Sequence, residues 1–324
     1  MFVDLPLDQL RTYRPPLPEP DGFDGFWKRT LDETRGHGLD ARFTETDAGL
    51  SQAACHDVEF SGFGGHRIRG WLLVPRAASG PLPCVVQYVG YSGGRGLPYQ
   101  WLVWPSAGYA VFVMDTRGQG WSPDTYGNTA DPVGGTGPEA PGQLTRGVLA
   151  PDDYYYRRLY ADAVRAVEAA RTHPAVDPER VVVSGGSQGG ALALAAAGLV
   201  PGLAGALVDV PFMTHIRRAV EITDADPYGE LARYLSGQRH LVDRVFDTLD
   251  HFDGLNFAAR ASAPALFSTA LRDAVTPTSG GFAAYHHYAG REKELKVWSF
   301  NGHEGGGAHQ QAEQVRFLRK LFGG

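Results

Sequence analysis

The segment that most constrains the fold of this chain places a serine between glycines where a strand meets a helix. Residues 180–183 form a β-branched run typical of a buried strand, and residues 191–197 form an Ala/Leu run typical of a closely packed helix. Between them lies Gly-x-Ser-x-Gly, made by Gly185, Ser187 and Gly189. In this context the pattern predicts a nucleophile elbow, a sharp turn that lifts the serine hydroxyl out of the sheet. Glycines suit that turn because side chains would collide with the neighbouring strand and helix.

Strand and helix patterns alternate along most of the chain. We expect strands at 56–60, 66–74, 84–89, 110–114, 180–183, 206–210, 265–271 and 295–300, and helices at 21–35, 101–107, 152–173, 191–197, 278–288 and 310–321. The first two strands alternate polar and apolar residues around a glycine-rich turn, which indicates an antiparallel hairpin. The alternation predicts an α/β protein with one doubly wound, mostly parallel sheet and an antiparallel N-terminal edge.

The chain shows no internal repeat, and we expect residues 1–324 to form a single domain. Residues 1–35 are predicted to be a Pro-rich arm followed by a helix, with Asp21 as its N-cap. Residues 121–150 predict a long, irregular loop. Residues 211–260 interrupt the alternation with helical patterns at 212–222, 228–236 and 241–250. They predict a helical, cap-like insertion beside the active site.

Composition excludes several classes of function. The net charge is -6 and no long basic run is present, which argues against nucleic-acid binding. No segment approaches the ~18 consecutive apolar residues of a membrane span, and the N-terminus has no signal-peptide pattern. Two cysteines, Cys55 and Cys84, do not make a disulfide framework. A cytoplasmic enzyme is therefore expected.

A serine hydroxyl needs a base to become a nucleophile. In the α/β-hydrolase fold the acid and the histidine follow the serine in that order, on loops after later strands. Asp273 and His303 satisfy this order, because each comes just after a predicted strand. We therefore predict Ser187, Asp273 and His303 as a catalytic triad. Asp209, which also ends a strand, is the alternative acid.

Backbone N–H groups are expected to form the oxyanion hole. One belongs to Gln188, the residue after the nucleophile, and the other to Tyr91 in the glycine-rich loop 90–96, which also predicts Tyr91 as a substrate contact. That loop lacks a phosphate-binding motif, and the segment around His303 and His309 lacks the His-Glu-x-x-His spacing of zinc sites. No metal or organic cofactor is expected.

Several motifs occur together in an order that is specific. They are Arg117-Gly118-Gln119-Gly120, Gly185-Gly186-Ser187-Gln188-Gly189, His303-Glu304, the loop 90–96 and the N-terminal Phe23-Asp24-Gly25-Phe26-Trp27. Along essentially its whole length the chain resembles the acetyl xylan esterase / cephalosporin C deacetylase family, carbohydrate esterase family 7. It departs from the family at Ser92, where Asn is usual, at residues 99–100, where His-Asp is common, and at 273–277, where Cys-Pro-Pro is more frequent.

The resemblance implies an esterase that removes acetyl groups from short xylo-oligosaccharides, cephalosporin C and small acetyl esters through an acyl-enzyme, without a cofactor. It implies an intracellular homohexamer built as a trimer of dimers. By position it gives Ser187, Asp273 and His303 the triad roles and Tyr91 and Gln188 the oxyanion roles, and it makes Arg117 and Gln119 structural. The alternatives are a general short-chain carboxylesterase, a prolyl-oligopeptidase-type peptidase, which would usually carry a propeller domain, and a non-catalytic carbohydrate-binding protein.

Overall fold

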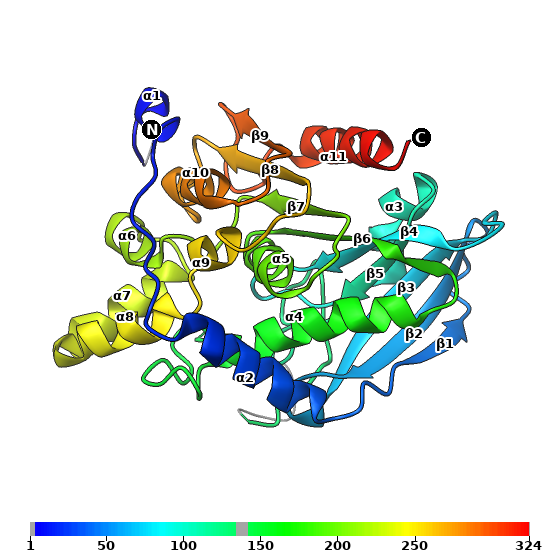
Figure 1. Ribbon diagram of the computed structural model, residues 1–324, viewed down its shortest axis with the longest axis horizontal. Coiled ribbons are helices and arrows are strands. Elements are labelled where there is room, and N and C mark those ends of the chain that lie inside the picture. The colour runs from blue at the N-terminus through cyan, green and yellow to red at the C-terminus, as the bar shows by residue number, and fades with distance from the viewer. Residues whose placement is uncertain (1–3, 134–141, 324) are drawn as a thin grey trace.

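The computed structural model describes residues 4–133 and 142–323, which contain a nine-stranded sheet (Figure 1). The strands are β1 Arg42–Thr46, β2 Ala53–Ser61, β3 Arg67–Pro75, β4 Leu82–Tyr88, β5 Ala110–Met114, β6 Val176–Gly186, β7 Gly205–Asp209, β8 Ala265–Ala270 and β9 Lys293–Trp298. Residues 1–3 of the predicted arm, 134–141 of the predicted loop and residue 324 lie outside the described residues.

The strand order is β1-β2-β3-β5-β4-β6-β7-β8-β9. Pairing is antiparallel from β1 to β5 and parallel from β5 to β9. The predicted mostly parallel sheet with an antiparallel N-terminal edge is thus confirmed. Strand β1 was not predicted, because Phe43 is its one strongly apolar residue and most of the strand is exposed.

Helices cover both faces of the sheet. They are α1 Leu7–Leu10, α2 Phe23–Arg35, α3 Val103–Ser106, α4 Tyr155–Thr172, α5 Gln188–Leu199, α6 Ile216–Ile222, α7 Tyr228–Gly237, α8 Val242–Asp250, α9 Gly254–Ala258, α10 Thr278–His287 and α11 Gly307–Phe322, with 3-10 turns at Phe63–Gly65, Pro98–Trp101 and Arg239–Leu241. Successive side chains of a strand point to opposite faces. In β4, Val86 packs in the apolar core that includes residues of α4 and α5. Its neighbour Val85 packs in a second apolar core, which contains Trp104 of α3 and Leu318 of α11.

Three local predictions were wrong in detail. Helix α2 begins at Phe23, and Gly22, with φ 78°, takes the cap position instead of Asp21. The predicted 101–107 helix is a 3-10 turn followed by the short α3. Helix α6 begins at Ile216 rather than at residue 212, because His215 adopts a left-handed conformation that no helix can include.

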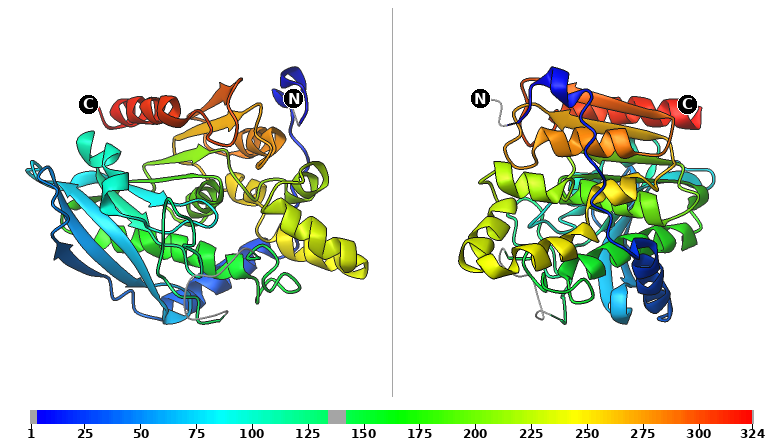
Figure 2. Two further views of the ribbon diagram at one scale, coloured as in Figure 1. Left: turned by 180° about the vertical axis from the view of Figure 1, so that it is seen from behind. Right: turned by 60° about the vertical axis from the view of Figure 1, so that its left-hand side comes forward.

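The N-terminal arm, residues 4–20, runs along the insertion and α10 (Figure 2). Asp4 accepts hydrogen bonds from Arg218 of α6 and from the backbone amide of Ser279 in α10, both at 2.7 Å. His286 and His287 of α10 contact the carbonyl oxygens of Tyr13 and Pro15. The arm therefore joins the first residues of the described chain to its last third.

The glycines of the elbow are packed against backbone. A Cβ built on Gly185 would lie 2.3 Å from the carbonyl of Gly189, and one on Gly189 would lie 2.5 Å from the carbonyl oxygen of Tyr88. Ser187 itself has φ 57° and ψ -122°, the strained conformation that projects its side chain from the turn. The predicted reason for these glycines is confirmed.

We expect Gly189→Ala to lower the free energy of unfolding by about 3 kcal/mol, because the clash is with backbone and cannot be relieved by a rotamer change. Gly25→Ala is the matched control. Gly25 lies in α2 with no atom within 4 Å of the added Cβ, so this change should raise stability by about 0.5–1 kcal/mol. Urea unfolding of both variants checks the contrast, and equal stabilities would contradict it.

Candidate active site

Three side chains from three loops at one edge of the sheet form a hydrogen-bonded chain. Ser187 lies between β6 and α5, Asp273 follows β8, and His303 follows β9. The Ser187 Oγ is 2.9 Å from His303 Nε2, and His303 Nδ1 is 2.9 Å from Asp273 Oδ2. The three residues predicted from chain order therefore meet, because parallel strands bring their carboxyl ends to the same edge.

Asp273 is held by donors of its own loop. Its Oδ1 accepts from the amides of Val275 and Thr276, and its Oδ2 accepts from the Thr276 hydroxyl at 2.8 Å. The carboxylate is fully buried and its remaining lone pairs face His303. Thr276 was not singled out from the sequence. A threonine three residues after an aspartate is the available signal, since such spacing is common in turns.

Asp209, the alternative acid, is occupied elsewhere. Its carboxylate accepts from the side-chain amides of Gln310, at 2.8 Å, and Gln314, at 2.5 Å, both in α11. Burial raises the pKa of Asp209 to about 6. The geometry therefore favours Asp273 as the partner of His303 and gives Asp209 a contact between β7 and α11.

The two predicted oxyanion donors are tied together by a buried glutamine. Gln188 is the first residue of α5, where helix N–H groups have no intrahelical partner. Gln119 donates to the side-chain oxygen of Gln188 at 2.8 Å and accepts from the amide of Ser92, next to Tyr91, at 2.7 Å. This contact links the loop after β4 to the elbow.

Ser187 opens into a hollow of about 650 Å³, a size typical of small-molecule sites. The lining residues are Gly90, Tyr91, Ser92, Trp121, Gly186, Ser187, Asp209, Val210, Asp226, Pro227, Glu230, Val275, His303 and Glu304. The insertion supplies Asp226, Pro227 and Glu230.

Within residues 4–133 and 142–323, no three His, Cys, Asp or Glu side chains are grouped to hold a metal ion. No helix of that part is long and apolar enough to cross a membrane.

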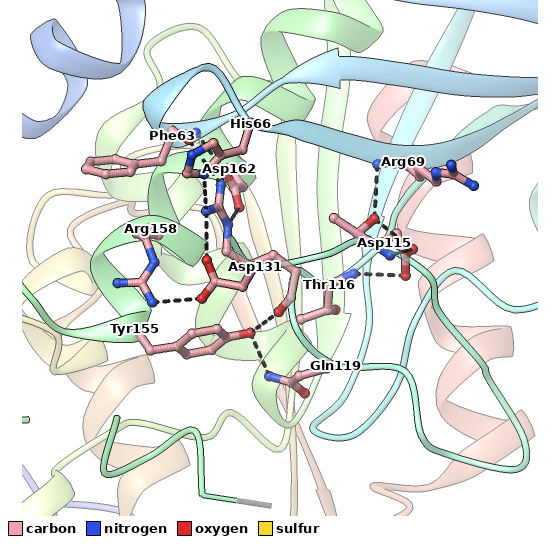
Figure 3. Close-up of polar contacts among 12 residues, drawn as sticks. Phe63, His66, Arg69, Asp115, Thr116, Gln119, Asp131, Tyr155, Arg158 and Asp162 are labelled. Carbon is pink, nitrogen blue, oxygen red and sulfur yellow. Dashed lines mark hydrogen bonds and ion pairs between the residues drawn. The ribbon is translucent and has the colours of Figure 1, made fainter. Parts of the chain in front are cut away.

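Arg117 forms a buried ionic cluster with Asp131 and Asp162, which are labelled in Figure 3 with Arg158. Its guanidinium donates to both oxygens of Asp162, at 2.5 and 2.7 Å, and lies 3.4 Å from Asp131, which also accepts from Arg158. Although burial alone would lower it, the two carboxylates raise the pKa of Arg117. The Tyr155 hydroxyl links the cluster to Gln119, because it donates to the Arg117 carbonyl and accepts from the Gln119 amide. The cluster thus supports the loop that carries Gln119.

We expect Arg117→Met to lower the free energy of unfolding by about 3–5 kcal/mol, because it leaves Asp162 buried without its counter-charge and removes one of the cations around Asp131. Arg42→Met is the control, since Arg42 pairs with Asp40 on the surface and should contribute less than about 1 kcal/mol. Chemical denaturation measures both. A loss of stability for Arg117→Met no greater than that of the control would refute the structural role.

The sheet, the serine at its strand-to-helix turn, and the loops after β8 and β9 that carry Asp273 and His303 define an α/β-hydrolase fold. The sequence model of the acetyl xylan esterase (AXE1) family matches residues 1–321. The chain belongs to the acetyl xylan esterase family, as the order of its motifs predicted.

Individual relatives agree with this assignment. The chain is similar to an acetyl xylan esterase from Paenibacillus sp. R4, with 38% identity and a TM-score of 0.89 over 98% of this chain and 99% of that one. It is also similar to acetyl xylan esterase 1 from Thermoanaerobacterium sp. JW/SL YS485, with 33% identity and a TM-score of 0.88 over the same shares. A curated relative, acetyl esterase Axe7A from Xylanibacter ruminicola, is 26% identical over 90% of this chain. That match spans 65% of the relative's length.

Proposed function

We propose that this protein is a serine esterase that removes acetyl groups from acetylated xylo-oligosaccharides and other small acetyl esters. The observation that carries the proposal is the hydrogen-bonded chain from Ser187 through His303 to Asp273, with two contacts of 2.9 Å, whose first two members line the hollow. The names of its relatives, acetyl xylan esterases and an acetyl esterase, support the choice of acyl group.

The geometry suits acyl transfer in two steps. His303 Nε2 takes the hydroxyl proton of Ser187 as Oγ attacks the acetyl carbonyl carbon, and Asp273 orients the imidazole and stabilises its charged form. The amides of Tyr91 and Gln188 donate to the oxyanion. The tetrahedral intermediate expels the sugar oxygen, which receives the proton from His303, and leaves an acetyl-enzyme. Water then gives a proton to His303 as its oxygen attacks the acetyl carbon. The second tetrahedral intermediate expels Ser187 Oγ, which receives that proton from His303, and acetate is released.

Finer properties rest on the family resemblance and are part of the proposal. They are activity toward cephalosporin C, a cytoplasmic location and a homohexamer built as a trimer of dimers. A general short-chain carboxylesterase is the second candidate. It is favoured by Val275, which lines the hollow within the segment that departs from the family's usual pattern.

Acyl-chain preference tests the proposal. We expect acetate release from acetylated xylo-oligosaccharides, and kcat/KM for p-nitrophenyl acetate at least tenfold above the butyrate and far above the octanoate. A misfit of one methylene in a fitted pocket typically costs 10-fold or more. Equal or faster turnover of the octanoate, with no release from the sugars, would replace the acetyl assignment by the general carboxylesterase. Release from cephalosporin C is measured in parallel.

A further inference from the structure

The side chain of Tyr91 makes a contact that the proposed chemistry does not use. Its hydroxyl donates to Glu230 Oε1 at 2.8 Å, with Oε2 at 3.0 Å, and accepts from the amides of Gly142 and Gln143 at 3.3 and 3.1 Å. Tyr91 lies in the loop after β4, whereas Glu230 lies in α7 of the insertion, 139 residues later. One phenol therefore joins the loop of the oxyanion hole to the helix that forms another wall of the hollow.

Glu230 is an unusual side chain to find at this position. It is 7% exposed, and within residues 4–133 and 142–323 no lysine, arginine or histidine forms an ion pair with it. Burial raises its pKa, an effect that the hydrogen bond from Tyr91 opposes. Burying a carboxylate without a counter-charge costs stability. Its place in the lining of the hollow beside Ser187 therefore points to a functional role rather than a stabilising one.

The carboxylate of Glu230 presents both of its oxygens to the Tyr91 hydroxyl, which donates its hydrogen there. Glutamine has the same size, but one of its two terminal atoms is an NH₂ group, which cannot accept that hydrogen. Glu230→Gln therefore removes the charge and one of the two acceptors without creating a cavity.

The tyrosine ring is held at both ends. Its hydroxyl is held by Glu230, and its ring packs edge-on against Trp121 and Phe212, with centroid distances of 5.8 and 6.5 Å. A held ring fixes the Cα of Tyr91 and the direction of its own N–H. Oxyanion donors must be aimed at the position that the oxyanion takes, since they stabilise the transition state more than the substrate.

We propose that Glu230 is a positioning residue for catalysis: through the Tyr91 hydroxyl it aims the Tyr91 amide at the oxyanion and makes turnover depend on the docking of α7. This inference rests on the proposed esterase function. In this inference the insertion contributes to the chemical step, in addition to lining the hollow.

The test compares Glu230→Gln, Tyr91→Phe and the double variant, with Glu221→Gln as control. Tyr91→Phe keeps the ring and the backbone N–H, and removes only the hydroxyl. Glu221 is exposed in α6 of the same insertion. With p-nitrophenyl acetate we expect each single variant to lower kcat by about 10- to 100-fold with KM changed less than threefold, which is below the loss of a whole donor. The double variant should be no worse than the poorer single one, because both remove the same contact. Glu221→Gln should match the wild type.

A second readout separates positioning from general loosening. A trifluoromethyl ketone forms a tetrahedral adduct with serine that carries an oxyanion, so its Ki should rise in parallel with the fall in kcat/KM. The Ki of acetate, which forms no adduct, should stay unchanged. Additive losses, a loss confined to KM, or an unchanged Ki for the ketone would overturn the inference. Ser187→Ala is measured alongside: if it is inactive while Glu230→Gln and Tyr91→Phe keep the wild-type kcat, the inference alone fails. If Ser187→Ala turns over, the proposed function fails first.

Discussion

Ser187→Ala is expected to lower kcat for p-nitrophenyl acetate by roughly 10⁴- to 10⁶-fold, the scale at which a triad serine acts. The change removes the attacking Oγ and leaves His303 with no proton to accept, while the oxyanion donors and the hollow remain. Alanine tolerates φ 57° no worse than serine does, so the elbow should keep its shape. Steady-state kinetics with active-site titration by an organophosphonate measures the effect.

The control is Ser262→Ala, because Ser262 is exposed and does not line the hollow. This variant should match the wild type in kcat and in labelling. If Ser187→Ala keeps more than about a hundredth of the activity, or is still labelled, another nucleophile carries the reaction. The proposed mechanism would then be wrong.

Asp273→Asn is expected to lower kcat by about 10⁴-fold. An asparagine NH₂ facing His303 Nδ1 would favour the tautomer that carries its proton on Nε2, and that tautomer cannot accept the proton of Ser187. The amides of Val275 and Thr276, which donate to Asp273 Oδ1, would keep the asparagine oxygen at that position and so turn its NH₂ toward His303. The comparison is made from kcat, with circular dichroism to show that the variant is folded.

Asp209→Asn tests the alternative assignment in the same assay. Its carboxylate is occupied by Gln310 and Gln314, so we expect a loss of stability and a loss in kcat far smaller than that of Asp273→Asn. The reverse order of the two losses in kcat would identify Asp209 as the acid. Asp273, in the loop after β8, would then not be the acid of the triad.

Features that depend on local pattern could be predicted from the sequence. The buried strands and the elbow were found because β-branched runs and packed glycines leave a clear signal. The order serine, acid, histidine then placed Ser187, Asp273 and His303 at one edge, and the structure brings them into hydrogen-bond contact. Strand β1 left too little apolar pattern to be recognised.

What could not be predicted depends mostly on contacts between distant segments. Glu230 matters because it meets Tyr91, 139 residues away in the sequence. Thr276 contacts Asp273 within the same loop, but an aspartate and a threonine at that spacing are too common to single it out. Helix α9 was missed because it is five residues long and is stabilised by its cap, where Asp253 accepts from the amide of Leu255. A single sequence does not encode such pairings in any periodic pattern.

The N-terminal arm has a consequence for how the chain reaches its final state. Asp4 finds its partner in α10 275 residues later, and its partner in α6 214 residues later. A chain synthesised from its N-terminus must therefore emerge at least as far as α10 before Asp4 can make both contacts. Contacts of such separation in sequence form late, since the loop that they close must first be ordered by other interactions. The loop that carries Asp273 leads directly into α10, so the arm docks on the helix that follows the acid of the proposed triad.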